Sequence, residues 1–265
     1  VFDRCQAQNG GAIFTQNTTV SIQQSFFSAN AAMLDGGAVS VTGGQAKLSN
    51  CRFQLNQAVS GQGGAVVLNG GSWDTLPYIA DALFESNFAK QGGGAVALLS
   101  LGADGIFGRD TVDLTAITFV SNLASNGGAI YVDSCRLPAL ANSLLKQNVA
   151  SQFGGALYWT NVLGCDRLSL LPSMNANQAG ISGGGIFIDS IQCPSCIQLE
   201  GTLSGNTPDQ IACSKSSAAF CARGVDVSSC ADTDVCGLGA VLCVRKNMTS
   251  SECFPKDSTC HQYQQ

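Results

Sequence analysis

The residues with the clearest potential for catalysis are a small group of acidic side chains around one arginine. The group consists of Asp104, Asp110 and Asp113, and Arg109 lies among them. Polysaccharide hydrolases and lyases use neighbouring carboxylates, with Ca²⁺ or a basic residue, to cleave glycosidic bonds. The segment also contains a Gly-Ala-Asp-Gly sequence, which is typical of a solvated loop. We favour the loop, and a polysaccharide lyase or hydrolase site is the minor alternative.

The other reactive residues favour structure over catalysis. His261 is the only histidine, which excludes a histidine-based triad and a multi-histidine metal site. Cys193 and Cys196 form a Cys-Pro-Ser-Cys motif with the form of a redox or zinc half-site, but no second Cys-x-x-Cys accompanies it. No phosphate-binding loop or dinucleotide fingerprint is present. We therefore expect no catalytic residue, no metal and no cofactor.

The composition narrows the partners and the compartment. Charged residues make up 12% of the chain, about half of the roughly 25% that is usual. A net charge of −5 gives no basic patch for nucleic acid, and no apolar run is long enough to insert into a membrane. Thirteen cysteines and two glycosylation sequons, at Asn17 and Asn247, predict an extracellular protein from the secretory pathway. The start at Val1, without a signal peptide, indicates a processed or excerpted segment.

The elements that position these residues come from a tandem repeat with two markers. A glycine doublet, or its Gly-Gly-Gly variant, begins at Gly10, Gly36, Gly63, Gly93, Gly127, Gly154 and Gly183. The second marker is a Phe, Leu or Met three residues before an asparagine; these asparagines are Asn30, Asn56, Asn87, Asn122, Asn148 and Asn177. Because the two markers keep one register over most of the chain, they define repeats of about 27 residues.

The repeat length and the apolar pattern predict the architecture. A period of about 27 residues holds three short strands and three corners, but not two packed helices with turns. Apolar residues alternate after each doublet, as in Val66/Leu68 and Ile130/Val132, which indicates strands with one buried face. We expect the doublet to allow positive φ at a corner, and the Asn and Phe columns to stack between coils. The predicted fold is all-β: a right-handed single-stranded parallel β-helix of about eight three-sided coils over residues 1–207.

The combination of Gly-Gly-Ala-Ile with Phe-x-x-Asn resembles the repeat of the chlamydial polymorphic outer-membrane proteins, which is also met in large surface proteins of algae and other protists. The resemblance covers about residues 2–206. It implies a surface-displayed β-helix with an adhesive or structural role. The cysteine content of this chain is more typical of a eukaryotic extracellular protein.

Residues 208–265 are predicted to form a disulfide-rich cap on the last coil, or else the start of a further cysteine-rich module. Their cysteines are Cys213, Cys221, Cys230, Cys236, Cys243, Cys253 and Cys260. Four more cysteines, Cys135, Cys165, Cys193 and Cys196, follow the strand after the doublet in successive repeats. We expect these four to form disulfide staples, for example Cys135–Cys165 and Cys193–Cys196, although the sequence does not fix the connectivity.

Between the two inward aliphatic positions after each doublet lies a position that should point outward. In the last three coils it is Tyr131, Tyr158 and Phe187. Exposed rings at coil spacing would suit another protein or the plane of a sugar. Alternatively, a loop or the tail covers the rings, or they only stack on one another.

The leading hypothesis is a non-enzymatic extracellular structural protein. Its rigid solenoid would be a building block of a filament, wall or glycocalyx, with other protein subunits, of the same or another kind, as partners. The alternative is a surface adhesin that binds a receptor or carbohydrate.

Overall fold

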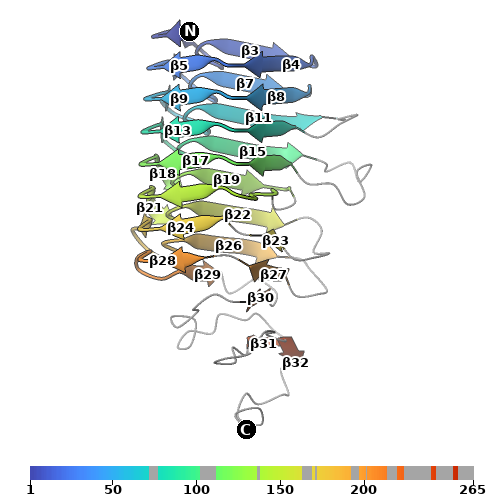
Figure 1. Ribbon diagram of the computed structural model, residues 1–265, viewed down its shortest axis with the longest axis vertical. Helices are drawn as coiled ribbons and strands as arrows, with labels where there is room; N and C mark the ends of the chain where they lie inside the picture. Colours follow the sequence, from blue (N-terminus) through green and yellow to red (C-terminus); the bar gives the residue numbers. More distant parts are fainter. Residues whose placement is uncertain are drawn as a thin grey trace.

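The computed structural model shows a parallel β-solenoid whose coils stack along one axis (Figure 1). It describes residues 1–71, 77–101, 112–135, 138–162, 169–170, 172–191, 197–200 and 202–213, and the strands at 220–223, 240–242 and 253–255. All regular elements in these ranges are strands. The prediction of an all-β parallel solenoid is therefore confirmed.

The strands that carry the Phe, Leu or Met marker form sheet A, and the strands just after the marker asparagines, or after Cys5 in the first coil, form sheet B. Sheet A consists of β1 (Phe2–Asp3), β5 (Phe26–Ser28), β9 (Arg52–Gln54), β13 (Leu83–Glu85), β17 (Thr118–Val120), β20 (Leu144–Lys146), β24 (Ser173–Asn175) and β28 (Leu203–Ser204). Sheet B consists of β2 (Gln6–Ala7), β6 (Ala31–Ala32), β10 (Gln57–Ala58), β14 (Phe88–Ala89), β18 (Leu123–Asn126), β21 (Val149–Phe153) and β25 (Gln178–Ala179).

Sheet C is formed by the seven strands that follow the glycine doublets and by one later strand that no doublet precedes, β29 (Ile211–Cys213). The seven strands are β3 (Ile13–Gln16), β7 (Val39–Thr42), β11 (Val66–Gly71), β15 (Val96–Leu101), β19 (Ile130–Asp133), β22 (Leu157–Val162) and β26 (Ile186–Ile191). Sheet D contains β4 (Val20–Gln23), β8 (Ala46–Ser49), β12 (Tyr78–Ala80) and β16 (Asp113–Thr115). A further parallel sheet contains β23 (Ser169–Leu170), β27 (Ile197–Glu200) and β30 (Phe220–Arg223), whereas β31 (Ala240–Leu242) and β32 (Cys253–Pro255) pair antiparallel.

The expectation of three strands per coil was wrong, because a regular coil contributes strands to four sheets. The additional strands are those of sheet B, in the segment between each marker asparagine and the next doublet, for which the sequence analysis predicted no strand. Most of them contain only two residues, which is too short for a recognisable alternation. Their second residue is a buried alanine, as at Ala32, Ala58 and Ala89, so the segment packs a small core of its own.

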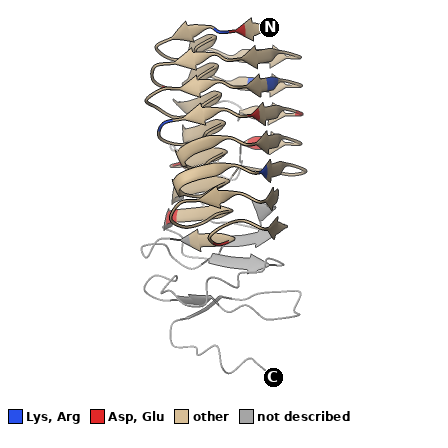
Figure 2. Cartoon of the chain, turned by 90° about the vertical axis from the view of Figure 1, so that its left-hand side faces the viewer, with Lys and Arg blue, Asp and Glu red and all other residues tan. Residues whose placement is uncertain are grey.

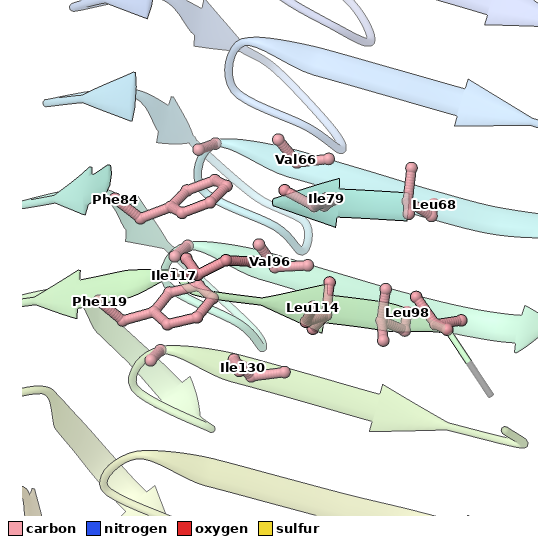
Figure 3. Close-up of a cluster of buried hydrophobic side chains, with 14 of the residues drawn as sticks. Val66, Leu68, Ile79, Phe84, Val96, Leu98, Leu114, Ile117, Phe119 and Ile130 are labelled. Carbon is pink, nitrogen blue, oxygen red and sulfur yellow. The ribbon is translucent and has the colours of Figure 1, made fainter. Parts of the chain in front are cut away.

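The lumen is filled by the Phe marker column, as predicted. The rings of Phe2, Phe27, Phe53, Phe84 and Phe119 stack with centroids 4.7–5.0 Å apart. Figure 3 shows Phe84 and Phe119 pointing between aliphatic side chains of sheets C and D. Leu145, Met174 and Leu203 continue the column in the later coils. Each coil therefore packs mainly on its two neighbours, as expected for a solenoid.

The Asn column forms the predicted ladder at the corner between sheets A and B. In each coil the Nδ2 group donates to the Oδ1 atom of the next asparagine; from Asn87 to Asn122 the distance is 3.0 Å. Nδ2 also donates to a carbonyl of the preceding coil, Phe53 in this case, at 3.0 Å. The ladder runs from Asn30 to Asn206, where the last Nδ2 donates to Gln210 Oε1 at 2.6 Å. The asparagines are thus buried and hydrogen-bonded inside the wall of the solenoid.

The two glycines of the doublet are required for different reasons. The first has positive φ in every coil, for example +64° at Gly93, and only glycine adopts this conformation without strain. The second has no positive φ but no space for a side chain. A Cβ at Gly94 would lie 2.2 Å from Gly128 O and 2.6 Å from Leu123 N. The doublet therefore allows the chain to turn and, one residue later, to approach sheet B of the next coil closely.

A column of left-handed residues precedes the Asn ladder and was not predicted. Its φ values are 51–57° at Arg4, Ala29, Leu55, Ser86, Ser121, Gln147 and Ala176, and 61° at Gly205. Seven of these eight residues have a Cβ, which destabilises this conformation by about 1 kcal/mol or more each. Because the side-chain types differ, no sequence pattern marks this column.

Candidate interaction surface

The structure brings the three aromatic residues of the predicted stripe into one stack on sheet C. Tyr131, Tyr158 and Phe187 lie on β19, β22 and β26 and are partners in the parallel register. The ring centroids of Tyr131 and Tyr158 are 5.4 Å apart, and those of Tyr158 and Phe187 are 5.6 Å apart. The interplanar angles are 2° and 7°, so the rings lie face to face along the solenoid axis.

This geometry leaves ring edges, and not ring faces, on the outside. Each face covers its neighbour, and the backbone of Gly92 lies so close to Tyr131 that an added Cβ would approach Cδ2 to 2.6 Å. At the other end, Phe153 contacts Phe187 with centroids 4.5 Å apart at 40°. Phe187 is only 7% exposed, so the expectation of three exposed rings is wrong for this residue. Parallel strands place equivalent side chains about 4.8 Å apart, a spacing that leaves no room for a sugar plane between them.

The side chains equivalent to Tyr131 on sheet C are buried in most of the earlier coils. Ser40, Val67 and Ala97 are at most 3% exposed, whereas Phe14 in the first coil is 50% exposed. The first glycine of the doublet lies against this position: a Cβ at Gly63 would lie 2.4 Å from Val67 Cγ2. The position predicted to point outward is therefore a second packing layer outside sheet C.

Burial and the nearby carboxylates hold the phenol groups of Tyr131 and Tyr158 neutral. Tyr158 Oη donates to Asp189 Oδ2 at 3.0 Å, and Asn161 Nδ2 donates to Asp133 Oδ1 at 2.8 Å. Burial, followed by the charges of Asp133 and Asp189, raises the pKa of Tyr131 to about 12. Burial and Asp189 also raise the pKa of Tyr158. At neutral pH both groups are protonated donors, which suits packing and hydrogen bonding rather than proton transfer.

Of the four residues considered for catalysis, the structure describes only Asp113. Asp113 begins β16, where its Oδ1 accepts a hydrogen bond from Thr115 Oγ1. Asp104, Arg109 and Asp110 lie outside the described residues. Within the described ranges, no three His, Cys, Asp or Glu side chains are grouped so that they could hold a metal ion. The same residues include no helix that is long and apolar enough to cross a membrane.

The cysteines differ from the expectation at the one staple position whose side chain is described. Cys135 carries a free thiol, so the expected Cys135–Cys165 staple is not formed in the structure. The reason is that its Sγ points into the wall, where it accepts a hydrogen bond from Leu101 N at 3.1 Å and donates to Asp133 O at 3.1 Å. Cys5 and Cys51 are also free thiols.

Most of the other sites predicted from sequence lie outside the described residues. Cys165, Cys193, Cys196, Cys230, Cys236, Cys243, Cys260 and Asn247 lie outside the described residues, and for Cys213, Cys221 and Cys253 only the strand backbone is described. Asn17 is exposed, just after β3, so its position is accessible to glycosylation. Parallel pairing continues beyond residue 207, through β29 and β30, while the boundary between the two predicted domains stays a prediction.

One surface was missed by sequence reasoning. Sheet B and the turn after each of its strands expose several apolar side chains, including Met33, Val59 and Ile181, at 61%, 40% and 57%. Between each ladder asparagine and the next doublet the sequence has almost no charge, and this was the signal that could have identified the surface.

The comparisons with known proteins agree with the repeat. The family model of the Chlamydia polymorphic membrane protein repeat matches residues 116–133, which run from the end of sheet D through β17, Asn122 and the glycine doublet to β19. The resemblance predicted from the two markers is therefore confirmed, and the chain carries a repeat of this type.

Two curated relatives match parts of the chain. The "Probable autotransporter YfaL" of Escherichia coli (strain K12) is 29% identical over 164 residues, which cover 56% of this chain and 13% of that protein. The "Metabotropic glutamate receptor-like protein R" of Dictyostelium discoideum is 27% identical over 148 residues, which cover 56% of this chain and 8% of that protein. The chain thus spans a small part of both relatives. No solved structure matches the chain significantly.

Proposed function

We propose that this chain is a non-catalytic structural segment of an extracellular surface protein. Its solenoid would serve as a rigid building block of a surface filament, wall or glycocalyx. The observation that carries the proposal is the unbroken Asn ladder from Asn30 to Asn206, in which the polar corner groups bond to the neighbouring coils. Such side chains stiffen the rod and are not available for a substrate.

The comparisons support the location. The polymorphic membrane protein repeat and the probable autotransporter both point to a cell-surface protein. The low share of charged residues, 12%, also suits a sparsely charged segment packed among other surface molecules.

Immunogold labelling of intact source cells with an antibody against the solenoid tests the location and the role. We expect label on the outer surface layer, and a thinner or disordered layer when the gene is deleted. Label confined to the cell interior, or an unchanged layer after deletion, would contradict the proposal.

Incubation of the purified chain with a panel of polysaccharides tests the non-catalytic part, with the heat-denatured chain as control. Release of reducing or unsaturated sugar ends by the native chain alone would overturn it.

An adhesive role is the second candidate, and it is favoured by the half-buried edges of Tyr131 and Tyr158 beside Asp133 and Asn161. A variant with Tyr131→Ala and Tyr158→Ala separates the two functions in a receptor or glycan binding assay. Phe14→Ala is the matched control, because Phe14 occupies the same column in the first coil. Binding that is lost in the tyrosine variant and kept in the control would favour the adhesin.

A further inference from the structure

One long edge of the solenoid combines regular spacing with an almost complete lack of charge. This neutral edge is defined as the residues from each ladder position to the first glycine of the next doublet: 5–10, 30–36, 56–63, 87–93, 122–127, 148–154 and 177–183. It contains two charged residues, Asp35 and Lys90. Asp35 is half-buried and accepts a hydrogen bond from Gln62 N at 2.7 Å, so Lys90 is the exposed charge.

The neighbouring face is different. Sheet A carries Asp3, Arg52, Glu85 and Lys146 on four of its eight strands, and Arg52 and Glu85 form an ion pair at 2.8 Å. Figure 2 shows most of the blue and red segments on strands towards the right of the view, whereas the turns along its left-hand side are mostly tan. The lack of charge is therefore a property of one edge, and does not follow from composition alone.

Exposed apolar side chains gather on the same edge. Of the nine large hydrophobic residues with exposed side chains in the described part, five belong to it: Met33, Leu34, Val59, Leu123 and Ile181. Met33 and Val59 are neighbours in consecutive coils, because their preceding residues, Ala32 and Ala58, are paired in sheet B. Exposed apolar residues that cluster on one face mark interaction surfaces more often than scattered ones do.

We propose that the neutral edge docks against the neutral edge of a second copy of this chain. The edge presents one row of side chains per coil, at the spacing of parallel strands, about 4.8 Å. Only a partner with the same axial repeat matches such rows over several coils, and another copy of this solenoid has that repeat. With Lys90 as the exposed charge, two copies meet along this edge with little like-charge repulsion.

The dimensions predict a weak contact. Seven strands of sheet B span roughly 34 Å at 4.8 Å per strand, and five residues of width give roughly 15 Å. The area is on the order of 500 Å² per partner, near the lower limit for a specific interface. Lateral pairing would therefore be weak between free chains and strong where many copies are held side by side on one surface. This inference deepens the proposed function and rests on it for the identity of the partner.

Sedimentation equilibrium of the 265-residue chain over a range of concentrations tests the inference. We expect a monomer–dimer equilibrium that is weakened about tenfold or more by Met33→Lys with Val59→Lys, since two charges would be buried in the contact. Lys90→Gln removes the exposed charge and should tighten the dimer. Tyr78→Lys is the matched control, because Tyr78 is an exposed hydrophobic residue on sheet D, and it should leave the dissociation constant within about twofold.

Three outcomes would overturn the inference: a chain that is monomeric at every concentration, a dimer unaffected by the Met33/Val59 variant, or a monomer whose edge binds a soluble polysaccharide instead. Circular dichroism of each variant shows whether it is folded, so a loss of dimer is not confused with a loss of fold. A folded monomeric rod that still labels the cell surface would reject only the self-association. A chain located inside the cell would reject the proposed function, whatever its oligomeric state.

Discussion

Asn87 shows how much the hydrogen bonds of a single side chain contribute to the stability of the solenoid wall. Its Nδ2 donates to Asn122 Oδ1 and Phe53 O, and its Oδ1 accepts from the backbone N and the Nδ2 of Asn56. All of these groups are buried, so the loss of this one side chain leaves donors and acceptors of the neighbouring coils without partners. An unsatisfied buried polar group costs about 1–3 kcal/mol.

We therefore expect Asn87→Ala to lower the free energy of unfolding by about 3 kcal/mol. Urea unfolding followed by circular dichroism measures it. Asn175→Ala is the control: Asn175 is half-buried on sheet A, its side chain bonds to the hydroxyls of Ser173 and Ser204, and its loss should cost less than about 1 kcal/mol. An equal loss of unfolding free energy in the two variants would show that a ladder asparagine contributes no more to stability than a half-buried asparagine on sheet A.

The thiol of Cys135 predicts a dependence of stability on pH. Burial is the main cause that raises the pKa of this thiol from 9.0 to about 12. Between these values the unfolded chain releases the proton and the folded chain keeps it. The contribution of the protonated thiol to the free energy of unfolding is therefore complete below about pH 9 and is lost as the pH rises towards 12.

Urea unfolding at pH 8, 9, 10 and 11 should show a falling free energy of unfolding, and Cys135→Ala should make the decline shallower. The variant also removes packing, which shifts the whole curve, but only removal of the titrating group changes its slope. Tyr131, whose pKa is also raised to about 12, leaves a residual slope above pH 10. Parallel curves for the two proteins would contradict the assignment.

At the scale of the elements, the sequence predicted those parts of the coil whose side chains repeat. The glycine doublets located the start of sheet C, and Phe-x-x-Asn located sheet A and both columns, because each column needs the same kind of residue in every coil: an asparagine in one and a large apolar residue in the other. Sheet B was missed because it depends on a buried alanine in strands of two residues, as at Ala58 and Ala89. The stacking of Tyr131 on Tyr158 followed from their spacing, but the cover at Gly92 comes from another segment of the coil and has no periodic signal.

The left-handed column before the Asn ladder offers a stabilising substitution. Leu55 has φ +57° and is 56% exposed, so it is strained and loses little burial when it is truncated. Gly205 already occupies the equivalent position of a later coil, with φ +61°. Leu55→Gly should raise the free energy of unfolding by about 1 kcal/mol, because the relief of strain exceeds the entropy cost of a glycine.

Thermal and urea unfolding measure this effect. Gln54→Gly, one residue earlier in β9, is the control and should destabilise by about 1 kcal/mol, as glycine does within a strand. If both glycine variants are destabilised equally, the positive φ at Leu55 carries no strain, and the left-handed column has no energetic cost.

At the scale of the whole molecule, stability is transmitted from coil to coil. In sheets A, B and C each strand pairs with its counterparts in the adjacent coils, and the Phe and Asn ladders follow the same rule. A molecule built in this way approximates a one-dimensional array in which each unit interacts with its nearest neighbours. A local defect should then weaken nearby coils more than distant ones.

Amide hydrogen exchange of the Asn87→Ala variant tests this property. The altered side chain bonds to the coils of Asn56 and Asn122, so protection should fall most in β10, β14 and β18. The loss should decline along the axis and be small in β24 and β26, because several intact coil interfaces separate these strands from the defect. The unsubstituted chain, measured strand by strand, is the reference. An equal loss of protection in every strand would show that the solenoid opens as one cooperative unit, and that the ladders couple all coils instead of adjacent pairs.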